Sequence, residues 1–386
     1  MTKKTDTPAI RFKGFSDTWE QRKLGEIGSV SMCRRIFKEQ TSETGDIPFY
    51  KIGTFGADPD AFISRELFEE YKSKYPYPQK GDILISASGS IGRTVEFAGN
   101  NEYFQDSNIV WLNHDERLSN PFLKCFYSVV KWAGIEGSTI KRLYNDNILN
   151  TVICMPSVPE QKRIGLFFEN LDNLITLHQR EYEKLHNIKK SMLEKMFPKN
   201  GSNVPEIRFK GFTEAWEQRK VREITDRYDN LRIPVAASLR IAGTTPYYGA
   251  NGIQDYVEGY THDGEFILVA EDGANDLKNY PVKCVKGRIW VNNHAHVLQG
   301  KCACADNQFL AYAISQADIE SLLVGGGRAK LNAETLMDIE LLLPSKDEQI
   351  QIGSYLARLD NLITLHQRDL EKLQNIKKSM LEKMFV

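Results

Sequence analysis

Apolar residues recur every three or four positions along residues 171–197, and again along residues 359–385. The second stretch repeats the first with three changes, and neither contains Gly or Pro. This spacing predicts two long helices, each with one apolar stripe. Because the stripes are alike, we expect the helices to pack against each other as an antiparallel pair. The predicted interface comprises Leu171, Leu174, Ile175, Tyr182, Leu185, Ile188, Met192, Met196, Leu359, Leu362, Ile363, Leu370, Leu373, Ile376, Met380 and Met384.

Both helices are expected to begin before the repeated stretch. Ser157 and Glu160, like Ser345 and Glu348, have the Ser-x-x-Glu spacing of a helix-capping box. From there each helix would run for about 40 residues, or roughly 60 Å. A helix of that length with one apolar side needs a partner. The simplest alternative to a further function of these helices is that they pack as a pair and only hold the domains together.

A second repeat lies well before each helix. Residues 10–23 return as residues 207–220, with eleven of fourteen letters identical. The regions between repeat and helix share no extended identity, and each is long enough for its own core. The chain is therefore expected to be a duplicated unit with a pseudo-two-fold axis. We predict an N-terminal arm (1–16), a first variable domain (17–156), a first long helix (157–197), a linker (198–206), a second variable domain (207–343) and a second long helix (344–386).

The two variable domains share a scaffold despite their different sequences. Each has a Pro-aromatic-Tyr step, and each has a strand that enters a Gly-bearing loop. Each also has a short segment before the helix, in which Arg142 matches Lys330 and Leu143 matches Leu331. Short β-rich runs with a few helices predict mixed α/β (α+β) domains.

Composition narrows the class of protein. A chain of 386 residues is too long for one ordinary core. Residues 1–7 are polar rather than leader-like, and no run is long enough to span a bilayer. The six scattered cysteines suggest reduced thiols and a cytoplasmic location. A net charge of −1 argues against a free-standing, non-specific nucleic-acid binder, which would usually be basic.

Catalytic and metal-binding patterns are weak. No Walker loop, dinucleotide fingerprint, nucleophile elbow or zincin helix is present. Asp60, Glu70 and Lys72 nominally fit a metal-dependent nuclease, but the residues between them look helical. His294, His296, Cys302 and Cys304 could supply four zinc ligands, yet their spacing matches no common zinc module. We therefore predict no catalytic residue, metal or cofactor in this chain.

The matched loops carry different polar side chains on the same frame. Arginine contacts guanine, asparagine contacts adenine and carboxylates contact cytosine in a major groove. Cations after a Gly-bearing turn, such as Arg142 and Lys330, suit phosphate contacts. The alternative is that these are ordinary polar surface loops. The candidate DNA-binding residues are Tyr50, Lys51, Ser86, Ser88, Ser90, Arg93, Thr139, Lys141, Arg142, Tyr247, Tyr248, Asn251, Glu271, Asp272, Asn275, Arg328 and Lys330.

The repeats resemble those of a known family. Gly-Phe-x-x-x-Trp-Glu-Gln-Arg-Lys motifs, Pro-Ser-x-x-Glu-Gln helix starts and Leu-Asp-x-Leu-Ile-Thr-Leu-His-Gln-Arg helices resemble the specificity subunit of type I restriction–modification enzymes. The resemblance covers nearly the whole chain. It implies two target-recognition domains that each bind one half of a bipartite DNA site, and an antiparallel coiled coil that sets their spacing.

The resemblance also implies partners. Two adenine-N6 methyltransferase (modification) subunits and two motor–nuclease (restriction) subunits would assemble around this chain. S-adenosylmethionine, ATP and Mg²⁺ would then belong to those subunits. Two other functions remain open from the residues alone: a structural coiled-coil scaffold that binds only protein, and a self-sufficient metal-dependent nuclease.

Overall fold

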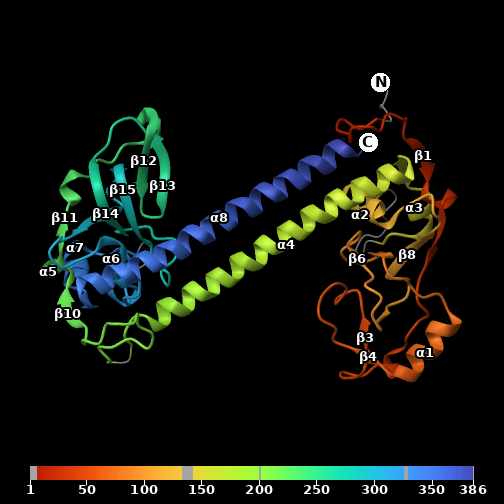
Figure 1. The fold of residues 1–386 in the computed structure, drawn as a ribbon, viewed down its shortest axis with the longest axis horizontal. Coiled ribbons are helices and arrows are strands. Elements are labelled where there is room, and N and C mark those ends of the chain that lie inside the picture. The colour runs from red at the N-terminus through yellow and green to blue at the C-terminus, as the bar shows by residue number, and fades with distance from the viewer. Residues whose placement is uncertain (1–6, 133–141, 200, 326–328, 386) are drawn as a thin grey trace. The chain divides into compact units, whose positions relative to one another are not determined.

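The computed structural model describes residues 7–132, 142–199, 201–325 and 329–385 (Figure 1). The chain forms two compact units, of which the first comprises residues 1–178 and 369–386 and the second residues 179–368. Two long helices, α4 (Val158–Lys195) and α8 (Lys346–Met384), each contribute residues to both units.

In its described residues, the first unit contains three small sheets, three short α-helices and two 3-10 helices, besides its parts of α4 and α8. Its four-stranded sheet has the order β2-β8-β5-β6, its three-stranded sheet has the order β4-β3-β7, and β1 pairs with β9. The strands are β1 (Glu20–Lys23), β2 (Gly28–Ser31), β3 (Ile47–Tyr50), β4 (Phe62–Ile63), β5 (Ile83–Ser86), β6 (Thr94–Glu96), β7 (Tyr103–Phe104), β8 (Ile109–His114) and β9 (Val152–Met155). The helices are η1 (Leu24–Glu26), η2 (Lys38–Gln40), α1 (Arg65–Lys74), α2 (Asn120–Val129) and α3 (Asn145–Leu149).

The second unit has one larger sheet with the order β11-β16-β14-β15-β12-β13, and β10 pairs with β17. The strands are β10 (Glu217–Lys220), β11 (Thr225–Arg227), β12 (Ala242–Gly249), β13 (Gly252–Val257), β14 (His262–Ala270), β15 (Val282–Val291), β16 (Ala295–Gly300) and β17 (Glu340–Leu343). The helices are α5 (Val221–Ile224), η3 (Asp229–Leu231), η4 (Ala237–Leu239), α6 (Asn307–Ser315), η5 (Glu320–Leu322) and α7 (Ala333–Asp338).

The two units share several strand pairings, although their sheets divide differently. The Pro-aromatic-Tyr steps open equivalent parallel pairings, because Tyr50 lies opposite Phe104 and Tyr248 opposite Val291. The central strands β5 and β14 pair antiparallel with β8 and β16. The mixed α/β class predicted from the short β-rich runs is confirmed, and so is the duplication.

Each hydrophobic core is completed by the ends of both long helices. In the first unit, Phe168 of α4 is buried in a core that also contains Met384 of α8. In the second, Leu356 of α8 is buried with Met196 of α4. The helices run antiparallel within each unit, because the start of one lies beside the end of the other. Apolar residues repeated in both helices thus serve two different domains.

Ion pairs at equivalent positions fix the helices to each other. In the first unit, Lys377 of α8 pairs with Asp172 of α4. In the second, Lys189 of α4 pairs with Asp360 of α8. Both pairs use residues of the repeated stretch, so the repetition of the sequence repeats the contact.

The apolar seam is narrower than the sequence stripe suggested. Leu171, Met196, Leu359 and Met384 are buried. Most other predicted residues are half-buried, namely Ile175, Tyr182, Leu185, Ile188, Met192, Ile363, Leu370, Leu373, Ile376 and Met380. Leu174 and Leu362, however, are 44% and 43% exposed. Along each helix, the less exposed residues recur every 3.5 residues on average and include Ile175 and Ile363. Leu174 and Leu362 each lie one residue earlier and therefore point away from the seam.

The starts of the long helices show a contact that the sequence did not predict. Arg11 binds Glu160 through two hydrogen bonds of 2.6 and 2.7 Å, and Arg208 binds Glu348 through two of 2.7 Å. Both carboxylates are fully buried. The predicted capping box is therefore wrong for the glutamates, because their oxygens accept from the repeated arm rather than from the helix start.

The glutamine after each of these glutamates is also buried and fully used. Gln161 donates to the carbonyls of Arg117 and Pro156 and accepts from the Ser119 amide. Gln349 makes the matching bonds to Cys304, Pro344 and Asp306. The Pro-Ser-x-x-Glu-Gln motif thus connects each long helix to the loop before α2 or α6.

No helix in the described part of the chain is long and apolar enough to cross a membrane.

We predict that Glu160→Ala lowers the free energy of unfolding by about 3 kcal/mol, because it leaves the mostly buried Arg11 guanidinium without its counter-ion. Glu206→Ala is the matched control, since Glu206 pairs with Lys195 at the surface, and it should cost less than about 1 kcal/mol. Urea denaturation of the two variants measures the difference. Equal losses would contradict a structural role for the Arg11–Glu160 pair.

Candidate nucleic-acid interface

Three chain segments meet where β5 ends in the first unit. The Ala87 amide donates to the Asn108 carbonyl (2.7 Å), and the Leu143 amide donates to the Ala87 carbonyl (2.8 Å). Ser88 forms a β-bridge with Arg142, and its hydroxyl donates to Asn108 Oδ1 at 2.8 Å. We call this meeting point junction 1.

The backbone at junction 1 is strained. Ser107 has a φ of 55°, and it is the sole non-glycine residue with positive φ in the described part of the chain. This conformation costs about 1–2 kcal/mol for a residue with a side chain. Arg142 holds it in place by donating from its guanidinium to the Ser107 carbonyl at 3.0 Å. Strain of this kind clusters at functional sites.

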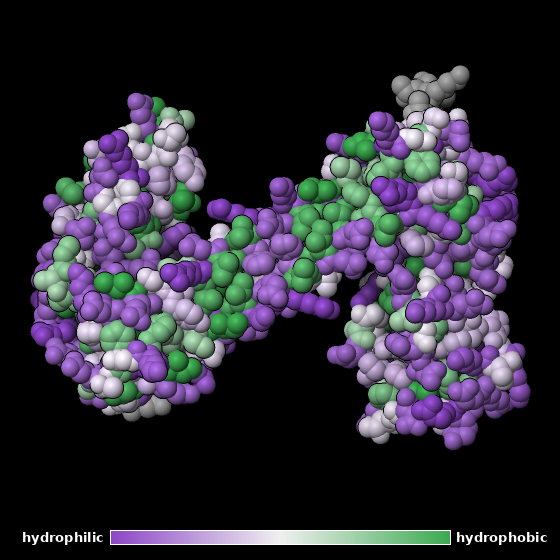
Figure 2. Space-filling model, in the orientation of Figure 1, coloured by the Kyte–Doolittle hydropathy of each residue, from purple (hydrophilic) through white to green (hydrophobic). Residues whose placement is uncertain are grey.

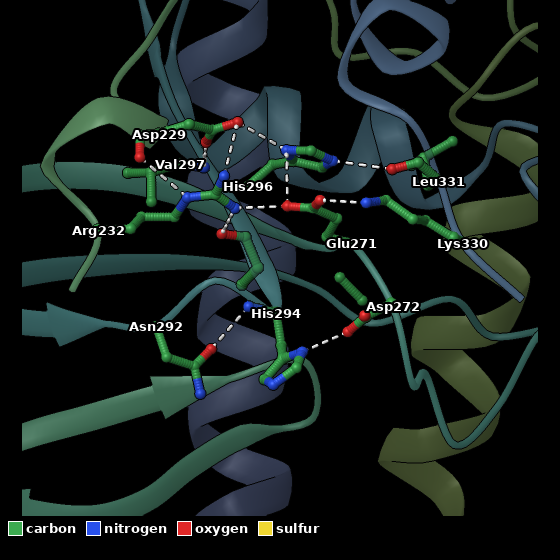
Figure 3. Close-up of polar contacts among 12 residues, drawn as sticks. Asp229, Arg232, Glu271, Asp272, Asn292, His294, His296, Val297, Lys330 and Leu331 are labelled. Carbon is green, nitrogen blue, oxygen red and sulfur yellow. Dashed lines mark hydrogen bonds and ion pairs between the residues drawn. The ribbon is translucent and has the colours of Figure 1, made fainter. Parts of the chain in front are cut away.

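The three equivalent segments of the second unit meet where β14 ends (Figure 3). We call this meeting point junction 2. The Glu271 amide donates to the His294 carbonyl (2.9 Å), and the Leu331 amide donates to the Glu271 carbonyl (2.7 Å). Asp272 forms a β-bridge with Lys330, and its carboxylate binds His294 Nδ1. The register inferred from the sequence, Arg142 with Lys330 and Leu143 with Leu331, is therefore the register in the structure.

Junction 2 rests on a buried network of charges that Figure 3 shows. Arg232 binds Glu271 at 2.6 Å and the Ala295 carbonyl at 2.9 Å. His296 lies between Asp229 Oδ2, 2.7 Å from its Nδ1, and the Leu331 carbonyl, 2.9 Å from its Nε2. Both of these partners are acceptors, so the ring makes both bonds only as a doubly protonated donor.

This network stabilises its carboxylates in the ionised form. Burial opposes ionisation of Asp229, but bonds from His296 and the Val297 amide lower its pKa below the ordinary 3.8. Burial likewise opposes ionisation of Glu271, and bonds from Arg232 and Lys330 lower its pKa below 4.5. Lys330 Nζ lies 2.9 Å from Glu271, so part of its charge is neutralised.

In the first unit, some of the predicted residues are buried and stabilise the loop, and others are exposed. Ser86 is buried, donates to the Ser90 carbonyl and accepts from the Arg93 amide, so its hydroxyl shapes the loop. Ser88 is buried as well. Ser90 and Arg93 are exposed, and Arg93 also donates to the Gly56 carbonyl at 3.1 Å.

The remaining candidates of this unit contact their neighbours. Tyr50 stacks on Phe104. Lys51 pairs with Asp60 at 2.9 Å and keeps 42% of its side chain exposed. Thr139 and Lys141, like Arg328 of the second unit, lie outside the described residues. Lys51 therefore remains a candidate, whereas Tyr50 has a packing role.

In the second unit, two predicted contacts are corrected by burial. Tyr247 is 1% exposed and its hydroxyl accepts from the Val235 amide, while Tyr248 is 7% exposed. Both side chains are almost fully buried, so neither is retained as a base contact. Asn251 and Asn275 are exposed, and Asn251 braces the loop by donating to the Gly273 carbonyl and accepting from the Asn275 amide.

Residues that sequence reasoning missed lie at both junctions. Asn108 carried no signal, because nothing in the sequence placed it beside Ser88. Arg232 and Asp229 likewise gave no sign that they reach Glu271 and His296. His294 was singled out only as a possible zinc ligand. A pairing across segments far apart in sequence needs the fold before it can be seen.

The two metal-dependent alternatives find no support in the geometry. Cys302 and Cys304 follow β16, whereas His294 precedes it, and six strand residues span roughly 20 Å. Asp60 pairs with Lys51, and Glu70 pairs with Lys74. The described residues contain no group of three or more His, Cys, Asp and Glu that could hold a metal.

The duplicated scaffold matches a known family twice. A family model described as "Type I restriction modification DNA specificity domain" matches residues 16–187 and 213–375. The chain belongs to this family. The resemblance noted from the repeats is therefore confirmed, and membership makes the chain a recognition subunit rather than a catalytic one.

Individual specificity subunits resemble the chain to different extents. It is 61% identical over 157 residues to a putative type I restriction enzyme specificity subunit of Haemophilus influenzae, a match that spans 40% of this chain and 41% of that protein. It is 25% identical over 402 residues to the putative type I restriction enzyme MjaX specificity subunit of Methanocaldococcus jannaschii. This match spans 95% of the chain and 92% of that protein.

One solved structure supports the fold of this specificity subunit. The S subunit of a type I restriction–modification system from M. genitalium superimposes with a TM-score of 0.72 and 16% sequence identity. The match covers 98% of this chain and 99% of that one. At this identity the similarity concerns the fold alone.

We predict that the network at junction 2 loosens in acid. Because the pKa values of Asp229 and Glu271 are lowered in the folded state, their stabilisation is complete above their ordinary values of 3.8 and 4.5. It is lost as the pH falls through the lowered values. The protection factor of the Val297 amide, which donates to Asp229 at 2.8 Å, should therefore fall below about pH 4.5, where its exchange rate is compared with that of an unfolded peptide at the same pH.

Asp229→Asn provides the comparison for that measurement. The variant should have a lower protection factor at neutral pH and lose less of it in acid. The Leu112 amide in β8 of the other unit should be the same in both proteins. Identical acid profiles at Val297 would show that Asp229 does not carry the effect.

Proposed function

We propose that this specificity subunit binds a bipartite DNA sequence, with residues 17–156 and 207–343 each recognising one half. The observation that carries the proposal is the pair of junctions. They share their main-chain bonds and bridges, yet present Ser88, Asn108 and Arg142 in one domain and Asp272, His294 and Lys330 in the other. A constant frame with different polar groups is what two related domains need to recognise two different sequences.

The proposed contact surface is smaller than the set chosen from the sequence. It retains the candidates whose polar groups reach the surface and omits Tyr50, Ser86, Tyr247 and Tyr248. Ser88, Glu271 and Asp272 act by holding their neighbours in place. The retained residues are Lys51, Ser90, Arg93, Arg142, Asn251, Asn275 and Lys330.

We further propose that the long helices bind two copies of a modification subunit. Leu174 and Leu177 of α4 are 44% and 55% exposed, and Leu362 and Leu365 of α8 are 43% and 53% exposed. Apolar side chains are visible along the surface of the long helices in Figure 2. The same leucine pair thus occurs twice, so a partner that binds one copy should bind the other.

The catalytic chemistry would reside in the partners. S-adenosylmethionine would belong to the methyltransferase subunits, and ATP with Mg²⁺ to two restriction subunits. Such a complex would act where the cell's DNA lies, which agrees with the cytoplasmic location expected from the thiols.

We predict that replacing residues 24–156 with the same region of another specificity subunit changes one half of the methylated sequence. The other half and the spacing should stay the same, because junction 2 and both helices are untouched. Mapping methylated adenines in cells that carry the chimera and its methyltransferase measures this. Changes in both halves would reject two independent domains. A protein-only scaffold would leave methylation independent of the exchanged region.

We predict that Arg142→Ala weakens binding to all DNA sequences and lowers the salt slope of the binding constant by about one. Lys330→Ala should have a smaller effect, because Glu271 already offsets the lysine charge. Lys74→Ala, which removes an exposed lysine of α1 outside the candidate loops, is the charge-matched control. Titrations of the assembled complex at several salt concentrations decide. An unchanged slope for Arg142→Ala would remove this residue from the interface.

A further inference from the structure

One side-chain position is built in the same way in both domains but holds different chemistry. Asn108 directly precedes β8, and His294 directly precedes β16. The carbonyl of each accepts the amide that follows the central strand by one residue. The side chain of each is held by the next residue along, Ser88 or Asp272. The position is therefore fixed by backbone and side chain together.

In the first domain, the amide group of Asn108 is held in one orientation. Ser88 donates to Oδ1, which leaves the Nδ2 group without a hydrogen bond in the described part of the chain. The strained Ser107 and its bond from Arg142 hold the backbone directly before it. Nδ2 only donates, so the position presents a donor. Donors of this kind contact guanine O6 and N7, adenine N7 and thymine O4.

In the second domain, the ring of His294 is also held by one edge. Its Nδ1 binds the Asp272 carboxylate and therefore carries a proton, while Nε2 has no hydrogen bond among the described residues. The His294 amide donates to Asn292 Oδ1 at 2.8 Å, which fixes the backbone. The side chain is 34% exposed. Nε2 accepts a hydrogen bond when the ring is neutral and donates one when it is protonated.

Charge and exposure favour a role beyond packing for these two residues. Both are half-buried, so they are held rigidly while one polar atom stays available. Each belongs to a junction that also carries a cation from the third segment, Arg142 or Lys330, which suits a phosphate contact near a base contact. Side chains that are fixed by neighbours in this way give more specific contacts than mobile ones.

We infer that Asn108 and His294 are specificity-determining residues that each contact one base edge in double-stranded DNA, through Nδ2 and Nε2 respectively. Ser88 and Asp272 are positioning residues that decide which atom faces the base. This inference rests on the proposed function and extends it to named atoms. The two domains thus differ in specificity partly because an amide donor at one junction is replaced by an imidazole at the other.

The first test exchanges the two side chains. Asn108→His and His294→Asn are made separately in the full chain and assembled with the methyltransferase partner. Adenine-methylation mapping then gives the modified sequence. Asn108→His should alter the preference at one base pair of the first half-site by roughly 10- to 100-fold, the range of a good base contact. His294→Asn should do the same in the second half-site.

Each variant carries its own folding control, because the untouched domain still recognises its half and the spacing is unchanged. Asn100→His changes an exposed asparagine of the same domain outside the junction, and it should leave the whole sequence unaltered. Unchanged base preference for both junction variants, in complexes that still methylate the wild-type sequence, would overturn the inference. Failure of the wild-type complex to methylate any bipartite sequence would instead reject the proposed function.

The second test separates positioning from packing. Asp272→Asn keeps the size of the side chain but lets it donate to Nδ1, which moves the ring proton to Nε2. The base preference should then change at the same base pair that His294→Asn affects. The double variant should show no further change. A uniform loss of methylation without a change in preference would show that Asp272 only packs, and would remove it from the mechanism.

Discussion

The core of each domain depends on the C-terminal end of a long helix that begins in the other unit. Phe385, which follows α8, packs against Trp19, Phe122 and Phe168 in the first unit. Phe197, which follows α4, packs against Trp216 and Phe309 in the second. Both cores therefore require an antiparallel helix partner. This requirement explains why the helix ends are repeated letter for letter while the domains they complete have diverged.

Two repeated pairs of polar residues attach each domain to the start of the other long helix in its unit. The Arg11–Glu160 and Arg208–Glu348 pairs join the arm before each domain to the start of a long helix. Because a buried carboxylate without its guanidinium is costly, neither partner can change alone. The domain between them is attached at both of its ends by a contact that is repeated in the two halves of the chain. Its loops can then vary without disturbing how the domain joins the helices.

Sequence reasoning succeeded where a signal is periodic or repeated. The long helices, the duplication and the match of Arg142 with Lys330 all follow from spacing. It failed where contacts join distant segments. The Ser-x-x-Glu spacing predicted a cap, but Arg11, far away in sequence, takes Glu160. Tyr247 looked like a loop residue, but its strand runs beneath Arg240, whose guanidinium lies 4.1 Å above the ring. Leu174 shared the stripe, but the less exposed positions of α4 alternate in steps of four and three residues through Leu171 and Ile175, which leaves Leu174 beside the seam.

The two junctions show how one frame supports two chemistries. At junction 2, Glu271, Asp272 and Lys330 are charged, and charges placed near a sheet need counter-charges. Arg232 and His296 lie against Glu271, and Asp229 in turn pairs with both of them. At junction 1 the corresponding groups are Ala87, Ser88 and Arg142, and Val110 takes the place of His296 in the strand pairing. A change of specificity at the surface therefore requires matching changes one layer below. This coupling means that a new half-site is gained more readily by exchanging a whole domain than by changing single loop residues.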